Sequence, residues 1–244
     1  MLVACLILFF PVHAEDKPLR IALDHWPPYI DRSHPEYGIA AELVITALHR
    51  AGYKSSITLE NWTGALEGTR LGVYDIIIAG WHTSKREELF KFSKPYLYNE
   101  IKFIKRKGKP ITYDTFEDLR GLLIGVVENY AYSPEFDNSN LLIKIPNNHL
   151  IQNLSLLQQG KIDLTLDDKW VILHQIEKYL PSSAQKFEFL DKPLAVRGLH
   201  LLVSRQNPAH KEIISEFDKA IVQMKSDGSF DEIVRKYQRE LVSD

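Results

Sequence analysis

The chain has 244 residues, of which 45% are hydrophobic and 25% are charged, and its formal net charge is -2. This composition is typical of a globular protein and excludes a disordered chain, because enough apolar residues are present to bury a core. Nucleic acid is not expected as a partner, since phosphate binding requires clustered Lys and Arg, and the one basic run covers only 105–107.

The chain begins with an apolar stretch over 2–10, followed by Val12-His13-Ala14. The stretch is too short to cross a bilayer and the small residues match a cleavage site, so we expect a secretory signal peptide over 1–14. A buried N-terminal strand is the alternative, because no Lys or Arg precedes the apolar stretch. Cys5, the one cysteine, lies in this segment, where 2–5 resembles a lipoprotein signal box too close to the start to act as one. The mature chain is therefore expected to lack disulfides.

Strands and helices are predicted to alternate in the first half of the chain. Apolar runs of strand length are followed by segments with apolar residues at helical spacing, and these segments stop near a glycine. Such alternation is typical of a parallel sheet covered by helices on both faces. The predicted strands span 19–23, 56–60 and 75–79, and the predicted helices span 38–50 and 62–71.

The same pattern returns in the second half of the chain. The run Leu71-Gly-Val-Tyr-Asp75 resembles Gln159-Gly-Lys-Ile-Asp163, because in each a glycine ends a helix and an aspartate opens a strand. Two such halves predict two lobes. The predicted strands span 122–127, 141–145 and 162–166; a helix spans 149–159 with Asn148 as its N-cap, and a short helix or turn spans 130–136.

Two apolar segments, 101–106 and 199–204, flank the second half, and we expect them to cross between the lobes. Amphipathic helices over 209–224 and 230–241 should then return to the first lobe. Two crossings give a hinge with a cleft between the lobes.

The densest motif is Thr83-x-x-Arg86, which is followed after a short gap by Phe-Ser-Lys-Pro-Tyr over 92–96. Trp26-Pro-Pro-Tyr29 lies before it, and Gly160-Lys-Ile-Asp163 lies after it. With these motifs in this order, the chain resembles the bacterial extracellular solute-binding proteins of family 3 over essentially its whole length after the signal peptide.

The resemblance implies an α/β protein with the two-lobe periplasmic-binding-protein fold of type II. Each lobe would hold a mostly parallel sheet flanked by helices, with two crossover strands at the hinge. Lobe 1 would comprise 15–106 and the return segment 199–244, and lobe 2 would comprise 107–198.

The resemblance also implies a periplasmic, monomeric protein without cofactor or metal. It would capture a small polar, amino-acid-like solute in the cleft and deliver it to an ABC transporter permease in the inner membrane. Two alternatives stay open: a ligand-sensing module for a membrane signalling partner, and a dehydratase-type enzyme on the same fold. Catalysis is disfavoured because the histidines are scattered without metal spacing and no nucleophile elbow is present.

Charged residues at family positions are the first candidates for ligand contact. Arg86 matches the arginine that holds the ligand's carboxylate, for which a planar fork of donors is suited, or it is a surface arginine paired with neighbouring glutamates. Thr83 matches a hydroxyl that shares the carboxylate, or it is a helix N-cap. Asp168 matches the carboxylate that accepts from the ligand's α-amino group. Alternatively, Asp168 is a solvated aspartate at the end of a strand, or Asp167 binds the α-amino group in its place. Arg197 would add an anion contact or form a hinge salt bridge.

Aromatic and neighbouring residues complete the predicted site. Trp26 and Trp62 fall where the family has rings that sandwich the ligand's side chain, with core packing as the alternative. Asp24 ends a predicted strand and would bind a polar side chain or cap a turn. Gly80 opens a loop one residue shorter than usual in the family, which changes the amides facing the ligand. Tyr130 follows a strand where amino-acid binders usually carry Gly-Thr, and we expect it to fill space that an α-amino acid would use.

Overall fold

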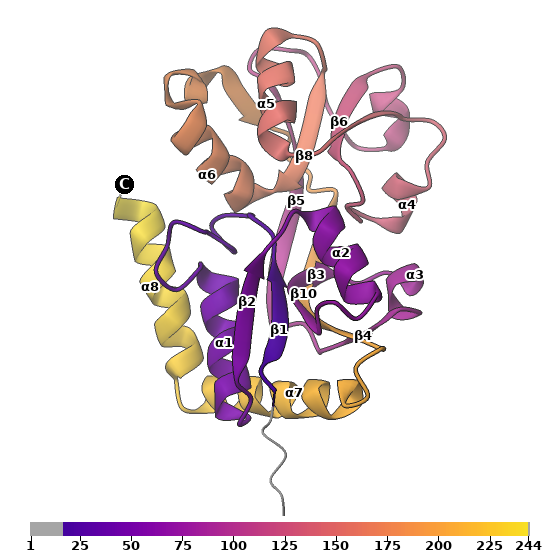
Figure 1. Ribbon diagram of the computed structural model, residues 1–244. Helices are drawn as coiled ribbons and strands as arrows, with labels where there is room; N and C mark the ends of the chain where they lie inside the picture. The colour runs from indigo at the N-terminus through magenta and orange to yellow at the C-terminus, as the bar shows by residue number, and fades with distance from the viewer. Residues whose placement is uncertain (1–16, 244) are drawn as a thin grey trace, which may run out of the picture.

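A computed structural model describes residues 17–243 and shows two lobes joined by a pair of long strands (Figure 1). The expected signal peptide over 1–14, with Cys5, lies outside the described residues. Both the first and the last elements of the chain belong to lobe 1, and the middle of the chain forms lobe 2.

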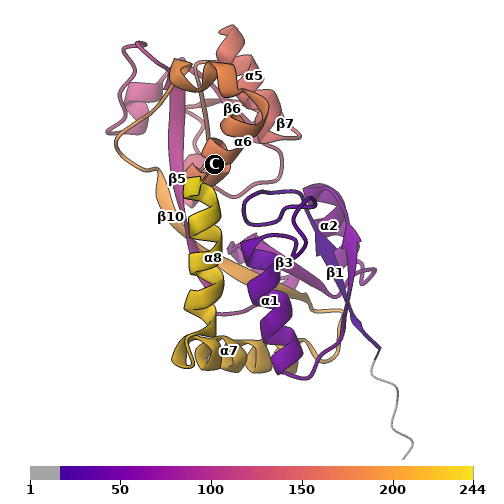
Figure 2. The ribbon, with the colours of Figure 1, turned by 90° about the vertical axis from the view of Figure 1, so that its left-hand side faces the viewer.

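Lobe 1 has a sheet in which β1 pairs in parallel with both β2 and β3. Every residue of β3 is buried, as expected for a strand covered on both faces. Helix α1 packs against the C-terminal helices α7 and α8 (Figure 2). The elements are β1 (Leu19–Leu23), α1 (Ile39–Arg50), β2 (Ser55–Leu59), α2 (Trp62–Arg70), β3 (Ile76–Trp81), α3 (Ser84–Glu87), β4 (Phe90–Phe92), α7 (His210–Ser226) and α8 (Ser229–Ser243).

Lobe 2 repeats this plan with β6 paired in parallel to both β7 and β8. Its helix α5 packs against β6 and β8 and against the following helix α6. The elements are the 3-10 helix η1 (Phe116–Leu119), β6 (Leu123–Val127), α4 (Pro134–Asp137), β7 (Ile143–Asn147), α5 (Leu150–Gln159), β8 (Leu164–Asp168), α6 (Lys169–Tyr179), the 3-10 helix η2 (Pro181–Lys186) and β9 (Phe187–Phe189).

The two lobes share a ribbon of two long strands, β5 (Leu97–Arg106) and β10 (Ala195–Ser204). The strands pair with each other in antiparallel register, and β10 also pairs with β3 while β5 also pairs with β8. One sheet therefore runs through the molecule in the order β2-β1-β3-β10-β5-β8-β6-β7. The predicted two-lobe α/β fold is confirmed. Since both strands serve both lobes, the division of the chain after residues 106 and 198 stays a prediction.

The repeated glycine–aspartate corner has the same structure in both lobes. Gly72 and Gly160 adopt positive φ angles of 75° and 77°, which an L side chain rarely adopts. Asp75 then accepts the backbone N–H of Arg20 at the edge of β1 at 2.9 Å, as Asp163 accepts the N–H of Leu123 in β6 at 2.9 Å. Each aspartate thus ties the start of one parallel strand to its neighbour.

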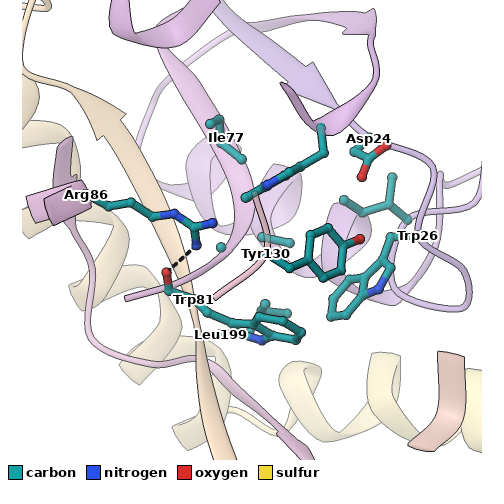
Figure 3. A pocket seen from close by; sticks show the side chains of 11 residues that line it. Asp24, Trp26, Ile77, Trp81, Arg86, Tyr130 and Leu199 are labelled. Carbon is teal, nitrogen blue, oxygen red and sulfur yellow. Dashed lines mark hydrogen bonds between the residues drawn. The ribbon is translucent and has the colours of Figure 1, made fainter. Parts of the chain in front are cut away.

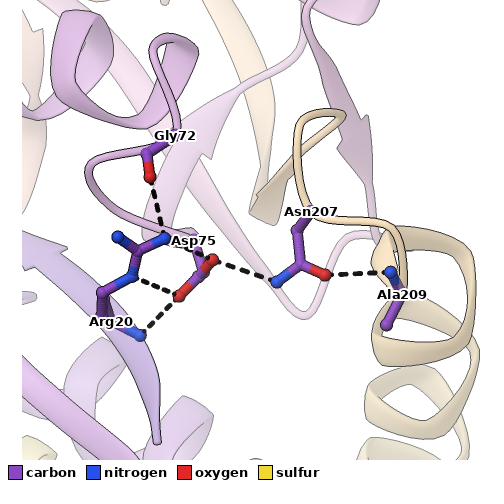
Figure 4. A network of polar contacts seen from close by, with 5 residues as sticks. All are labelled: Arg20, Gly72, Asp75, Asn207 and Ala209. Atoms are coloured by element: carbon purple, nitrogen blue, oxygen red, sulfur yellow. Dashed lines mark hydrogen bonds and ion pairs between the residues drawn. The ribbon is translucent and has the colours of Figure 1, made fainter. Parts of the chain in front are cut away.

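In lobe 1 this corner extends into a larger polar network (Figure 4). The Arg20 side chain donates to Asp75 at 2.9 Å and to the carbonyl of Gly72 at 2.8 Å. Asn207 donates to Asp75 at 3.0 Å and accepts the N–H of Ala209 at 2.9 Å, just before α7. The segment before α7 is therefore hydrogen-bonded to the same corner that joins β3 to β1.

Two local predictions need correction. Helix α5 begins at Leu150 after His149, whose N–H donates to Gln152, so Asn148 is not its N-cap. Helix α6 has no counterpart among the predicted elements, and it begins directly after β8, which ends at Asp168. This second difference changes the role of Asp168.

Candidate functional site

A small cavity of about 30 Å³ lies between the lobes, at the carboxyl ends of β1 and β3 (Figure 3). Ligand groups commonly bind at this end of the strands in open α/β sheets. Six of the residues expected at the site lie on its wall, whereas Thr83 and Asp168 do not. The lining residues are Asp24, Trp26, Ile30, Trp62, Ile77, Ala79, Gly80, Trp81, Arg86, Tyr130 and Leu199.

Arg86 is buried, with 9% of its surface exposed, although it lies on the short helix α3. Its guanidinium donates to the carbonyl of Trp81 at 2.7 Å and to the carbonyl of Asn129 in lobe 2 at 2.6 Å. It also lies 5.0 Å from the centre of the Trp62 ring. Among the described residues no carboxylate forms a salt bridge with Arg86, so the alternative of a surface arginine paired with glutamates is wrong.

The electrostatic surroundings of Arg86 are unfavourable for a cation. Burial lowers its pKa to about 10, and the positive charge of Arg197 adds to this effect. The Asp137 carboxylate opposes this effect, but it forms no salt bridge with Arg86. A guanidinium carries five N–H groups, and the two hydrogen bonds to carbonyl oxygens engage only some of these donors. A buried cation with free donors and no salt-bridge partner among residues 17–243 is suited to an anionic ligand.

Thr83 has the N-cap role that was one of its two expected roles. Its hydroxyl oxygen accepts the backbone N–H of Arg86 at 3.1 Å. The side chain borders a second, wider groove of about 620 Å³ between the lobes, which also reaches Arg86, Tyr130 and Arg197. Arg197 donates to the carbonyl of His82 and forms no hinge salt bridge within the described part of the chain. Contact of Thr83 or Arg197 with a ligand stays a prediction.

Aromatic rings form most of the cavity wall. The Trp26 ring packs edge-on against Trp81 at 5.6 Å between ring centres and stacks on Tyr29 at 4.7 Å. Tyr130, from lobe 2, packs edge-on against Trp62 at 5.8 Å and against Trp81 at 5.5 Å. Figure 3 shows the Tyr130 ring in the middle of this group, between Arg86 and Trp26. Tyr130 therefore fills the space between the rings, and that an α-amino acid would use this space stays a prediction.

Trp81 was not predicted as a site residue. It is the last residue of β3, and its indole N–H donates to Asn99 at 2.8 Å. The signal that could have found it is its place directly after Gly80 at the carboxyl end of a buried strand. Gly80 itself is needed for packing, because an added Cβ would lie 2.6 Å from Cδ1 of Leu202.

Asp168 does not have a free carboxylate in this structure. One oxygen caps α6 by accepting the N–H groups of Trp170 at 2.9 Å and Val171 at 3.3 Å. The other oxygen accepts from the Asn99 side chain at 3.3 Å and the Glu100 N–H at 3.1 Å. The alternative of a solvated strand-end aspartate is wrong, because the side chain is fully buried. Burial is also the main reason that its pKa rises to about 6.

Asp167 is the carboxylate of lobe 2 that faces lobe 1. One oxygen accepts the indole N–H of Trp26 at 3.3 Å and the N–H of Asp168 at 2.7 Å, and the other has no hydrogen-bond partner among the described residues. Burial, together with the nearby carboxylates of Asp168 and Asp24, raises the pKa of Asp167 to about 8, against smaller opposing effects of the hydrogen bonds from the Asp168 N–H and Trp26. A buried acceptor without a partner is costly unless a donor reaches it.

Asp24 is the second carboxylate near the cavity. It follows β1, and one oxygen accepts the N–H of His25 at 2.7 Å. Burial raises the pKa of Asp24 to about 7, against a smaller opposing effect of Arg32. The site therefore has a cation, Arg86, at one end and two carboxyl groups without a salt-bridge partner at the other, Asp24 and Asp167, across aromatic walls.

No three His, Cys, Asp or Glu side chains within residues 17–243 are grouped so that they could hold a metal ion. No helix in the same range has the length and apolar character that a membrane crossing requires.

Comparison with known proteins gives a consistent pattern. The model of a family described as bacterial extracellular solute-binding proteins, family 3, matches residues 19–240. The ABC transporter arginine-binding protein 1 of Escherichia coli is 22% identical over 212 residues, which cover 85% of this chain and 85% of that protein.

Two solved structures are similar in fold. A mutant of ArgBP from T. maritima has a TM-score of 0.77 at 18% identity and covers 91% of this chain and 95% of its own. A histidine kinase sensor domain with similarity to periplasmic binding proteins has a TM-score of 0.78 at 18% identity, with 90% and 95% covered. At these identities the likeness concerns the fold alone.

Proposed function

We propose, for a chain that belongs to the bacterial extracellular solute-binding proteins of family 3, that it captures a small amino-acid-like solute between its lobes and delivers it to an ABC transporter permease. The observation that carries this proposal is Arg86, a buried guanidinium on the cavity wall that has no salt bridge to a carboxylate within the described chain. A ligand carboxylate would supply the missing counter-ion through paired, charge-assisted hydrogen bonds.

The ligand's ammonium group is assigned to Asp167 in lobe 2. Its free oxygen is the one buried carboxylate oxygen near the cleft without a donor among the described residues. A ligand that joins Arg86 in lobe 1 to Asp167 in lobe 2 would stabilise the closed form, because only closure brings both groups into reach. Asp168, the family position for this role, would instead cap the start of α6 with its side chain and orient the Asp167 carboxylate with its backbone N–H.

Trp26 and Trp62 would form walls for the ligand's side chain, and Asp24 would accept from a polar or cationic end group. Burial raises the pKa of Asp24 to about 7, so a cationic end group would favour its ionised form. The E. coli relative that is named for arginine binding makes a basic amino acid a natural first probe.

The remaining parts of the proposal concern the setting of the protein. The expected signal peptide over 1–14 would direct it to the periplasm, where it would act as a monomer. Delivery to a permease is preferred over a sensory role because the E. coli relative is named for an ABC transporter. Binding without turnover is part of the proposal, so incubation with a prephenate-like acid should leave that acid unchanged.

Isothermal titration calorimetry with a panel of L-amino acids tests the proposal. Arg86→Ala should weaken binding at least about thirtyfold, since truncation of a desolvated charge pair costs roughly 2 kcal/mol or more. Arg120→Ala is the matched control, because that arginine is exposed and pairs with Glu117 far from the cleft. Unchanged affinity in Arg86→Ala would refute the carboxylate clamp.

A further inference from the structure

The segment Glu128–Tyr130 leaves lobe 2 and enters the site of lobe 1. It directly follows β6, and its path is fixed by backbone bonds from Glu128 to Asn147 at 2.9 Å and from Tyr130 to Val127 at 3.2 Å. Asn129 has a φ angle of +62°, a conformation that non-glycine residues rarely adopt. This turn aims a carbonyl group and an aromatic ring at the groups assigned to the ligand.

The Asn129 carbonyl oxygen takes the place of a carboxylate oxygen. It accepts from the Arg86 guanidinium at 2.6 Å and from the Trp62 indole at 3.1 Å. The Asn129 side chain adds a bond to the hydroxyl of Thr63 at 3.1 Å. Three donors or acceptors of lobe 1 are thereby engaged by one residue of lobe 2.

The Tyr130 ring takes the place of a ligand side chain. It packs edge-on against both Trp62 and Trp81, and Figure 3 shows it inside the ring of cavity-lining residues. The space left beside it is about 30 Å³, and one water needs about 10–15 Å³ of such space, so the cavity admits a few waters at most. An amino acid cannot enter this space unless Tyr130 moves out.

We propose that Asn129 and Tyr130 form a tethered competitor of the ligand, which holds the lobes closed in the ligand-free protein and determines which solutes bind. The identity of the competing ligand rests on the proposed function, whereas the closed ligand-free state does not. A tethered group competes at a high effective concentration. The apparent affinity for a free solute is therefore the intrinsic affinity multiplied by the fraction of molecules in which the competitor is displaced.

The competitor also defines the class of solute that can replace it. The solute has to offer Arg86 an anionic oxygen in place of a carbonyl, and it has to offer the tryptophan rings a flat or cationic group in place of the tyrosine. Asp24 lines the cavity and Asp167 accepts from Trp26 beside it, and a cationic group there would be stabilised by the ionised form of each carboxyl group. We therefore expect carboxylates with a guanidinium or similar planar cation to compete best, and small aliphatic acids to compete poorly.

Calorimetric titration with L-arginine is the first test. Tyr130→Ala should bind L-arginine at least about tenfold more tightly than the wild type. Tyr98→Ala is a control on an exposed tyrosine of β5 and should bind like the wild type. Weaker binding by Tyr130→Ala would show that Tyr130 is a ligand contact, and would overturn the competitor while leaving the proposed function intact.

Small-angle X-ray scattering of the ligand-free proteins is the second test and needs no ligand. The wild type and Tyr130→Phe should give the curve calculated for the closed lobes, whereas Tyr130→Ala should show a larger radius of gyration. Identical curves for all three proteins, or an open wild type, would overturn the proposal. Opening of Tyr130→Ala with no binding of any amino acid to either protein would support the competitor and refute the proposed amino-acid ligand.

Discussion

The carboxyl group of Asp167 should make the free energy of unfolding depend on pH, and Asp167→Asn tests this. Burial raises its pKa to about 8 in the folded protein, from an ordinary value of 3.8. Between these values the folded protein holds a proton that the unfolded chain has released. The contribution of this group to stability is therefore greatest at low pH and is lost as the pH rises towards 8.

The size of the effect follows from proton linkage. One proton bound only by the folded state changes the free energy of unfolding by about 1.4 kcal/mol per pH unit. From pH 5 to pH 7 the wild type should lose about 3 kcal/mol through Asp167. For a chain of this length, this corresponds to a fall in Tm of roughly 6–12 °C. Asparagine does not titrate, so Asp167→Asn should lack this slope.

Differential scanning calorimetry of both proteins between pH 5 and pH 8 measures the difference. Burial lowers the pKa of His25 and of His200, which gives an opposite slope at acidic pH. Both proteins share that slope, so the difference between the two Tm profiles reports the loss of Asp167 together with its effect on the neighbouring carboxyl groups of Asp24 and Asp168. Asp191→Asn, at an exposed position, should follow the wild type. Parallel profiles for the wild type and Asp167→Asn would refute the reasoning.

Three further changes should lower Tm, measured by circular dichroism at pH 7. Asp168→Ala removes the cap of α6 and should cost about 1–2 kcal/mol, or roughly 2–8 °C. Gly80→Ala places a Cβ 2.6 Å from Cδ1 of Leu202 and should cost about 1–3 kcal/mol through overpacking. Asp75→Ala leaves the backbone N–H of Arg20 in β1 without its acceptor and should cost about 1–3 kcal/mol.

Each of these changes has its own contrary outcome. An unchanged Tm for Asp168→Ala, with Asp191→Ala as the exposed control, would mean that α6 does not depend on its cap. An unchanged Tm for Gly80→Ala would mean that Leu202 moves aside without cost. If Asp75→Ala were harmless while the equivalent Asp163→Ala destabilised, the two corners would not be equivalent in energy.

Much of the fold could be predicted because its signals are local. The alternation of strand and helix, and the glycine–aspartate corner repeated at Asp75 and Asp163, depend on backbone conformation and on neighbouring strands. Helix α6 was missed because its first turn follows a buried strand without a break, and its cap, Asp168, also matches a binding motif. Both oxygens of Asp168 already accept hydrogen bonds from the protein, so the same side chain cannot also accept from a ligand.

The site was harder to predict where backbone groups do the binding. The positions of Arg86, Trp26 and Tyr130 follow from motifs, and the structure brings them together. The bond from Arg86 to the carbonyl of Asn129 involves no side chain of Asn129, so no residue pattern encodes it. Trp81 ends a buried strand and is itself buried, so its sequence position does not separate a cavity-lining tryptophan from a core tryptophan.

The position of β10 has a consequence for how the chain acquires its structure. This strand lies between β3 and β5 in the sheet, yet it is made after all the residues of lobe 2. The strands β1, β2 and β3 therefore wait with an unpaired edge while more than a hundred residues follow them, whereas lobe 2 has its own consecutive strands and helices at once. Lobe 2 is expected to fold first, and the nascent lobe 1 to be the part that needs protection from aggregation until β10 arrives.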